Sequence, residues 1–328
     1  MSAAYDVAGI GNAIVDIIAP ATEAFLADEG LIKGSMILID EDHATRLYDH
    51  MAAGIEASGG SAANSLAGLS SFGGRGAFMG KIAADALGRV FAHDIRAIGV
   101  DFRSAPLEDG AATGQCLINV TSDGQRTMTT FLGAAALLSP ADVDPGLIAA
   151  SEVVYLEGYL FDPEPAREAL KKAARLARES GRKVALTLSD AFVVERWRDD
   201  LTAFIEADVD LLFANEAEVT ALFRTDFDAA VRELGGRTAL AAVTRGAQGS
   251  VVLADGEVIE IAAEPIGKVV DTTGAGDQYA AGFMFGLARE RPLPECGRLG
   301  SIAAAEVISH YGPRPQVSLA ELAATQGL

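Results

Sequence analysis

Six almost continuously apolar runs alternate along the chain with segments of helical periodicity. The runs cover residues 5–10, 76–82, 152–158, 183–189, 209–215 and 238–244. Such runs are typical of parallel strands that are buried on both faces of a sheet. The helix-like segments between or after them are 86–98, 164–180, 216–223 and 276–290. The alternation predicts an α/β fold with a doubly wound, mostly parallel sheet flanked by helices.

Two regions interrupt this alternation. Residues 12–40 and 111–133 contain short strand-like stretches, and we expect no helices between those strands. No Pro-, Gly- or Ser-rich linker separates either region from its surroundings, so both should be insertions into one domain that spans 1–328. We interpret them as a small β-sheet at the edge of the α/β body and as a candidate lid.

Composition and charge narrow the function classes. Half of the 328 residues are apolar and 22% are charged, which is typical of a soluble globular protein. No stretch approaches the ~18 apolar residues of a membrane span, and the first residues lack a secretory pattern. Cys116 and Cys296 are too few for a disulfide framework, which favours a cytoplasmic location. A net charge of −20 argues against binding to nucleic acid.

The string VVDTTGAGDQYAAGF (269–283) carries the strongest chemical signal. Asp271 and Asp277 bracket two threonines and a Gly-Ala-Gly turn, and a small-residue helix pattern follows. Gly274–Gly276 would therefore lie at a helix N-terminus, where free N–H groups favour an anion. Asp277 could then accept a proton from a hydroxyl that attacks phosphorus. A bare Gly-x-Gly-Asp could also be an ordinary helix start, because Asp is favoured there.

The full string resembles the second signature of the ribokinase-like, or PfkB-type, carbohydrate and nucleoside kinases, and the resemblance extends over essentially the whole chain. Residues 59–91, beginning GGSAAN, are similar to the first signature of that family, and ANEAEV (214–219) matches its Asn-x-x-Glu element. The resemblance implies ATP and Mg²⁺ as cofactors, Asp277 as catalytic base and Gly274, Ala275 and Gly276 as the anion hole.

The same resemblance implies a nucleotide half of the site. Asn215 and Glu218 would organise the magnesium-bound phosphates, with Glu218 acting on Mg²⁺ through water. The residues Thr244, Arg245 and Gly246 would lie near ATP. In family members activated by a monovalent cation, the segment at Asp271 and Thr273 helps to bind it, so K⁺ is a candidate activator. Asp271 could instead simply cap the turn.

The acceptor half is best matched by adenosine kinases. GIGNAIVDIIA (9–19) resembles their opening, which places Asn12 and Asp16 in the acceptor site, with Asp16 suited to two adjacent ribose hydroxyls. Gly59, Gly60 and Asn64 match the Gly-Gly-x-x-x-Asn acceptor element of the family.

A purine base would need flat apolar walls. Phe192 occupies the place of an aromatic wall in adenosine kinases, and Tyr159 or Leu160 could form the second wall, although either aromatic could belong to the core. Met36 and Leu38, in SMILID, are also assigned to the acceptor site. The familiar eukaryotic adenosine kinases carry Gln at the position of Met36, so one polar contact to the base is absent here.

Several other features complete the expectations. Arg126, in SDGQRTM, matches a lid arginine that can close over the phosphates. GIGNAI (9–14) lacks the third glycine of a dinucleotide-binding fingerprint, so we reject a dehydrogenase. The four histidines have no metal-ligand spacing, and Trp197 should be a packing residue.

The sequence therefore favours an ATP-dependent kinase of a primary alcohol, with the 5′-hydroxyl of adenosine as the preferred acceptor. A sugar kinase of the same family and a non-catalytic nucleoside or nucleotide sensor are the two alternatives. We expect a small-molecule partner, no membrane partner, and a candidate homodimer formed through the outer face of the lid.

Overall fold

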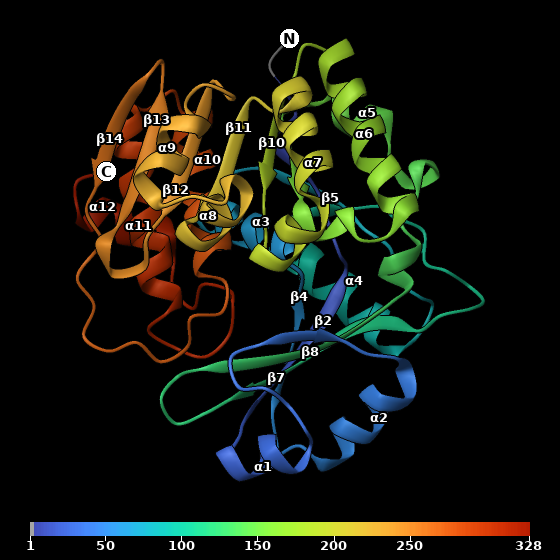
Figure 1. Ribbon diagram of the computed structural model, residues 1–328. Helices are drawn as coiled ribbons and strands as arrows, with labels where there is room; N and C mark the ends of the chain where they lie inside the picture. Colours follow the sequence, from blue (N-terminus) through green and yellow to red (C-terminus); the bar gives the residue numbers. More distant parts are fainter. Residues whose placement is uncertain (1–2) are drawn as a thin grey trace.

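A sheet of nine strands forms the centre of the computed structural model, which describes residues 3–328 (Figure 1). Its order is β14-β13-β12-β11-β10-β9-β1-β5-β6. The strands are β1 (Tyr5–Ile10), β5 (Gly76–Met79), β6 (Asp101–Phe102), β9 (Ser151–Glu157), β10 (Lys183–Thr187), β11 (Leu211–Asn215), β12 (Leu240–Thr244), β13 (Ser250–Ala254) and β14 (Glu257–Ile261). From β12 to β6 all neighbours are parallel, and β13 and β14 add an antiparallel edge.

Both faces of this sheet are buried, which explains why its strands contain so few polar residues. On β1, Ala8 and Ile10 join one apolar core while Val7 joins the other. The first core is covered by α5 (Pro145–Ala149), α6 (Glu164–Glu179), α7 (Ala191–Asp208), α8 (Glu216–Phe223) and α9 (Phe227–Leu234). The second is covered by α3 (Ser61–Ser71), α4 (Ala86–Ala97), α10 (Ala275–Ala288) and α11 (Leu293–Val307), and α12 (Leu319–Thr325) packs outside α11. The predicted doubly wound α/β fold is confirmed. The six strands predicted from apolar runs correspond to β1, β5, β9, β10, β11 and β12, and the four predicted helices correspond to α4, α6, α8 and α10.

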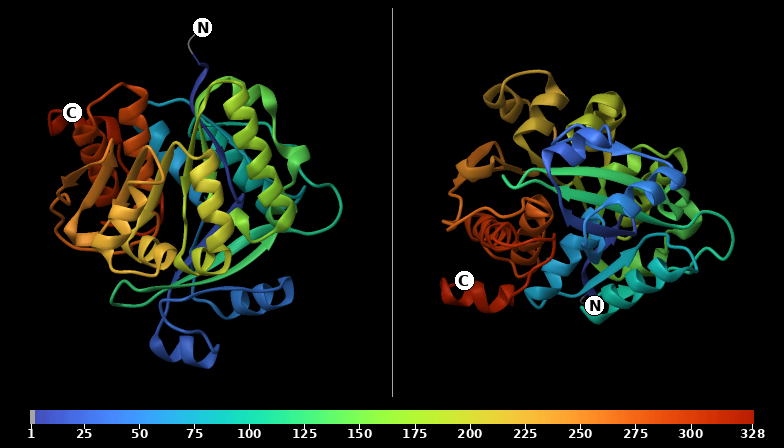
Figure 2. Two further views of the ribbon diagram at one scale, coloured as in Figure 1. Left: turned by 45° about the horizontal axis from the view of Figure 1, so that its top comes forward. Right: turned by 90° about the horizontal axis from the view of Figure 1, so that it is seen from below.

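A second, five-stranded sheet crosses one end of this body (Figure 2). Its order is β3-β8-β7-β2-β4, formed by β2 (Ile14–Pro20), β3 (Met36–Leu38), β4 (Ile55–Gly59), β7 (Thr113–Val120) and β8 (Arg126–Gly133). Strands lie in both regions predicted to be strand-like. The expectation of no intervening helix is wrong, because α1 (Glu23–Asp28) follows β2. This helix is too short to show a period, and its start is fixed by Thr22, whose Oγ1 accepts from the N–H of Phe25.

The small sheet has one face toward the body and one covered face. Ile14 and Asp16 of β2 line a cavity against the body, whereas Val15 and Ile17 belong to the second core, which also contains Leu47 of α2 (Glu41–His50). Figure 1 shows α1 and α2 on the side of the sheet that faces away from the body. The outer face considered for a homodimer is therefore not a bare sheet surface, and the homodimer stays a prediction.

Two smaller expectations concern single features. Trp197 packs against the first core at a kink in α7, and its Nε1 donates to Asp162 at 2.7 Å. Within residues 3–328, none of the helices combines the length and apolar character that crossing a bilayer requires.

Candidate active site

The site is built where β1 and β9 lie side by side and the chain leaves the sheet in opposite directions. Such a point, at the carboxyl ends of parallel strands, leaves a crevice for a ligand. Glu157 ends β9 and is 1% exposed. Its carboxylate accepts from Asn12 Nδ2 at 2.6 Å and from the N–H of Ala62, in the first turn of α3, at 3.0 Å. Glu157 thus joins the link between β1 and β2 to the start of α3.

Burial raises the pKa of Glu157 to about 7, although the hydrogen bonds from Ala62 and Asn12 oppose this shift. Glu157 is not among the site residues predicted from the sequence. The available signal is an acidic side chain at the end of an otherwise apolar strand, EVVYLEG, since a charge in that position needs partners at the edge of the sheet.

Asp277 lies in the first turn of α10, beside unpaired backbone N–H groups. Gly274 precedes the helix with φ +77°, and a Cβ there would lie 2.7 Å from Pro313, so the turn requires glycine. The N–H groups of Gly276 and Asp277 have no acceptor among residues 3–328, as expected for the first turn of a helix. The predicted anion hole and the carboxylate therefore face the same space.

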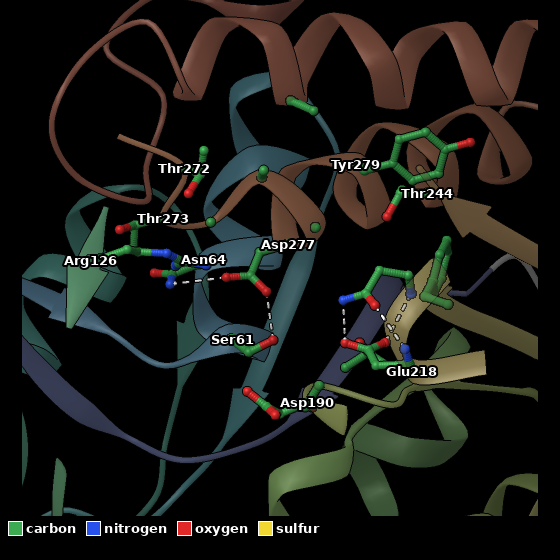
Figure 3. A pocket seen from close by; sticks show the side chains of 18 of the residues that line it. Ser61, Asn64, Arg126, Asp190, Glu218, Thr244, Thr272, Thr273, Asp277 and Tyr279 are labelled. Atoms are coloured by element: carbon green, nitrogen blue, oxygen red, sulfur yellow. Dashed lines mark hydrogen bonds between the residues drawn. The ribbon is translucent and has the colours of Figure 1, made fainter. Parts of the chain in front are cut away.

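The carboxylate of Asp277 is held from α3. Ser61 Oγ donates to Asp277 Oδ1 at 2.6 Å, and Asn64 Nδ2 donates to Oδ2 at 3.3 Å (Figure 3). Burial raises the pKa of Asp277, while these two hydrogen bonds and the charge of Arg126 oppose that rise. The result is an oriented carboxylate that can accept a proton. Ser61 was missed in the sequence, although it lies within the first signature.

Asn215 and Glu218 form a reciprocal cap at the start of α8. Glu218 Oε1 accepts from Asn215 Nδ2 at 2.7 Å, Oε2 accepts from the N–H of Asn215 at 3.0 Å, and Asn215 Oδ1 accepts from the N–H of Glu218 at 2.9 Å. Burial raises the pKa of Glu218 to about 8. Because both carboxylate oxygens already accept hydrogen bonds, this pair fits Mg²⁺ held through water better than direct coordination.

One continuous cavity of about 880 Å³ connects these groups. It extends from the small sheet, past the start of α10, to the loop that follows β14 and to α11. The predicted residues that line it are Asn12, Asp16, Met36, Leu38, Gly60, Asn64, Arg126, Tyr159, Phe192, Asn215, Glu218, Thr244, Gly246, Thr273, Gly274, Ala275, Gly276 and Asp277. The sequence analysis missed the apolar lining at the far end of the cavity, namely Pro265, Ile266, Val269, Ala304 and Ile308.

Four predicted residues lie outside the cavity wall. Leu160 is fully buried in the first core, so Tyr159 and not Leu160 lines the cavity. Arg245 is directed away, because its Nε donates to Glu216 at 3.2 Å and its guanidinium stacks on Phe227 at 3.9 Å from the ring centre. The expectation that Arg245 lies near ATP therefore has no support in the geometry.

The other two predicted residues outside the cavity wall are Gly59 and Asp271, and each affects a residue that lines the cavity. A Cβ at Gly59 would lie 2.2 Å from the carboxylate of Asp16, so glycine leaves the space that Asp16 occupies. Asp271 Oδ1 accepts from the N–H of Thr273 at 2.9 Å and from its Oγ1 at 2.6 Å, and Oδ2 accepts from the N–H of Gly312 at 3.1 Å. Asp271 thus caps the turn, which is the alternative that the sequence left open.

The end of the cavity beneath the small sheet combines charge with aromatic walls. Asp16 is 4% exposed, and burial raises its pKa to about 7 while the charge of Arg314 opposes the rise. Tyr159 and Phe192 lie with ring centres 6.4 Å apart at 37°. Arg126 lies on the opposite side of Asp277 from Glu218 in Figure 3, and its side chain makes no hydrogen bond or ion pair with residues 3–328. No group of three or more His, Cys, Asp or Glu in that part of the chain could hold a metal ion.

The raised pKa of Glu218 predicts how stability depends on pH. The ordinary pKa is 4.5 and the folded value is about 8, so the folded protein binds the proton more tightly than the unfolded chain. The contribution of Glu218 to stability is therefore greatest below its unfolded pKa and declines as pH rises through about 8. Glu218→Gln removes this titration, so the melting temperature of the variant should gain on the wild type between about pH 5 and about pH 9. Glu179→Gln, at the exposed end of α6, is the control. If the difference in melting temperature between Glu218→Gln and the wild type stays constant over that pH range, the raised pKa of Glu218 is contradicted.

Comparisons with known proteins agree with this geometry. Residues 34–319 match the model of the pfkB family carbohydrate kinases. The crystal structure of adenosine kinase from Sinorhizobium meliloti has 50% identity and a TM-score of 0.95, over 99% of both chains. A probable sugar kinase from Rhizobium etli CFN 42 has 44% identity and a TM-score of 0.96, also over 99% of both chains. Adenosine kinase 2 of Arabidopsis thaliana is 26% identical over 93% of this chain and 94% of its own length. The chain therefore belongs to the pfkB family of carbohydrate kinases, and it is an ATP-dependent phosphotransferase that uses an alcohol group of a nucleoside or sugar as acceptor.

Proposed function

We propose that the protein transfers the γ-phosphoryl group of ATP to the 5′-hydroxyl of adenosine and so produces AMP. The observation that carries this proposal is the position of Asp277. Its carboxylate faces the unpaired N–H groups of its own helix and the cavity that holds Asp16, Tyr159 and Phe192. The similar structure from Sinorhizobium meliloti, described as an adenosine kinase, supports the same acceptor.

In the proposed reaction, Asp277 orients the attacking hydroxyl and accepts its proton. Phosphoryl transfer depends mainly on positioning and on electrostatic stabilisation, and the proton leaves late. Ser61 and Asn64 hold the carboxylate in place. The free N–H groups at the start of α10 stabilise the negative charge of the transferred group.

The acceptor half is proposed to bind the nucleoside through a carboxylate and two aromatic rings. Asp16 accepts hydrogen bonds from the two adjacent ribose hydroxyls, and Asn12, Gly60 and Asn64 contact the sugar. The base lies between Tyr159 and Phe192, and Met36 and Leu38 add apolar contacts above it.

The nucleotide half is proposed to lie at Thr244, Gly246 and Thr273, with Arg126 binding the phosphates from the small sheet. Mg²⁺ bound with the phosphates would neutralise part of their charge, and Glu218 would contact it through water. Activation by K⁺ at Asp271 and Thr273 stays a prediction. The hydrogen bonds from Thr273 to Asp271 already close the turn without a cation.

A sugar kinase is the second candidate function. Two observations favour it: Met36 offers no hydrogen bond to a purine, and the probable sugar kinase from Rhizobium etli CFN 42 shares the whole fold. The non-catalytic sensor is not retained, because the chain belongs to an enzyme family and keeps Asp277 with its anion hole.

An acceptor panel separates these two candidates. Initial rates with ATP and Mg²⁺ are measured for adenosine, inosine, ribose and fructose. We expect adenosine to have the highest kcat/KM, because Tyr159 and Phe192 contribute binding only when a base is present. A sugar that equals or exceeds adenosine would replace the nucleoside with the sugar as the acceptor. Phe192→Ala distinguishes the two candidates further. The substitution should lower kcat/KM for adenosine and leave kcat/KM for a sugar unchanged.

Asp277→Asn tests the base. The change keeps the size of the side chain and removes its proton-accepting charge, so kcat should fall by about 10²–10⁴-fold. The Kd of the acceptor should change much less, because the proposed contacts to the sugar come from Asn12, Asp16, Gly60 and Asn64. Asp255→Asn, in the exposed turn between β13 and β14, is the matched control. If the variant retained more than about half of the wild-type kcat, and chemistry were shown to be rate-limiting, Asp277 would not be the catalytic base.

Residues 12–40 and 111–133, which supply the strands β2, β3, β7 and β8 of the small sheet, are proposed to act as a lid. Closure would exclude water from the transferring phosphoryl group and bring Arg126 to the phosphates. Amide hydrogen exchange in these two segments should slow when adenosine is added, while exchange in β13 and β14 should not. Unchanged exchange in both segments at saturating acceptor would mean that the small sheet does not move.

A further inference from the structure

The C-terminal segment after α11 is hydrogen-bonded to the loop before α10 and to α10 itself. Its Ile308 carbonyl accepts from the N–H of Val270 at 2.8 Å, and the N–H of Gly312 donates to Asp271. Gln278 Nε2, one residue beyond Asp277, donates to the carbonyls of Pro313 and Asn64, both at 2.9 Å. The segment therefore has a fixed position behind the wall of the cavity.

Arg314 extends from this segment toward the small sheet. Its Nε donates to Asn64 Oδ1 at 3.3 Å, and its Nη1 donates to Ser58 Oγ. Ser58 Oγ in turn donates to Asp94 Oδ2 at 3.3 Å. One guanidinium thus joins α3, β4 and, through Ser58, α4. Arg314 does not line the cavity, and its Nη2 is buried without a hydrogen-bond partner among residues 3–328.

The contact with Asn64 has a chemical consequence for Asp277. A guanidinium can only donate hydrogen bonds, so the oxygen of the Asn64 amide faces Arg314 and the NH₂ group is left to face Asp277. That NH₂ group donates to Asp277 Oδ2 at 3.3 Å. If the amide were reversed, its oxygen would face a carboxylate and repel it. The orientation of the base is therefore set from Arg314 through Asn64.

Arg314 also reaches the strands that carry Asp16, because Ser58, which accepts from its Nη1, is paired in the small sheet with Val15, the neighbour of Asp16. The groups that act on this carboxylate are Asp277 from α10, Asp271 from the loop before it, Arg126 from β8, the thiol of Cys116 from β7, and Arg314. Of the four charged groups with the main influence on Asp16, Arg126 and Arg314 are positive and Asp277 and Asp271 are negative. The side chain of Arg126 has no hydrogen-bond or ion-pair partner within residues 3–328 and is proposed to bind phosphate, whereas Arg314 is held by two hydrogen bonds. Burial lowers the pKa of Arg314 to about 10, so its charge persists at neutral pH.

We propose that Arg314 is a positioning residue for the acceptor half of the site: it orients Asp277 through the amide of Asn64, and it supplies the fixed positive charge that balances Asp16. The second role depends on the proposed function, because it assumes that Asp16 must be ionised to accept hydrogen bonds from acceptor hydroxyls. The first role holds for any alcohol that Asp277 deprotonates.

Two substitutions separate these roles. Arg314→Met removes both the charge and the donors, so kcat/KM for adenosine should fall by about 10-fold to 100-fold. Without the positive charge, the pKa of Asp16 rises further, so the acidic limb of the pH profile for adenosine Kd should move to higher pH. Arg314→Lys keeps the charge but cannot reproduce the fork that reaches Asn64 and Ser58 together. It should therefore keep the wild-type pH profile of Kd and still lower kcat.

Arg175→Met, on the exposed side of α6, is the control and should match the wild type in every measurement. Melting temperatures establish that each variant is folded. An Arg314→Met protein with wild-type kcat and an unshifted pH profile would overturn the proposal. If Arg314→Met does not fold, Arg314→Lys decides alone, since a wild-type kcat in that variant would refute the orientation of Asp277 through Asn64.

The proposed function and this inference fail in different ways. If the wild type phosphorylates a sugar and not adenosine, the nucleoside assignment fails, and the comparison of kcat between wild type, Arg314→Met and Arg314→Lys is made with that sugar. If the wild type phosphorylates adenosine and the Arg314 variants do so equally well, only the role of Arg314 is wrong.

Discussion

The burial of several carboxylates in one cavity is the constraint on which the rest of the site depends. Asp16, Glu157 and Glu218 are each at most 4% exposed, and Asp277 is half-buried among them. None of the four forms an ion pair with residues 3–328. Three are held by neutral donors, namely amides, a serine hydroxyl and backbone N–H groups. A carboxylate stabilised in this way keeps a raised pKa and remains available to a ligand.

The fold supplies these donors at little cost because of where its helices begin. Glu157 faces the first turn of α3, Glu218 belongs to the first turn of α8, and Asp277 belongs to the first turn of α10. Each of these turns has N–H groups that no helix residue can satisfy. The first turns of these three helices line one cavity, and β9 and β11 end beside it. Acidic side chains are thus gathered in the cavity of a protein that already carries a net charge of −20. The N–H groups at the start of α10 and the guanidinium of Arg126 are the groups there whose chemistry suits a phosphate.

Local pattern was sufficient to predict six strands of the large sheet, the helices α4, α6, α8 and α10 and the residues of the signature strings, because both the apolar periods and the glycine turns are encoded over short distances. The long helices α7 and α11 were not predicted. Contacts between distant segments could not be predicted. Asn12 and Glu157 are separated by 145 positions, and Arg314 reaches Asn64 across 250 positions. The direction of a side chain was equally inaccessible: Arg245 follows a strand that ends in the cavity, yet its guanidinium prefers Glu216 and Phe227. The strand β4 was missed because IEASG has no apolar run, and it is held in the sheet by pairing with β2.

The central claim is that the hydroxyl of a nucleoside reaches Asp277 while its sugar is held by Asp16. A crystal structure of the protein with adenosine bound measures this most directly. The account predicts the 5′-oxygen within hydrogen-bond distance, about 2.6–3.2 Å, of the Asp277 carboxylate. It also predicts the ribose diol on Asp16 and the base between Tyr159 and Phe192. Adenosine bound at the other end of the cavity, or with its 5′-oxygen directed away from Asp277, would contradict it.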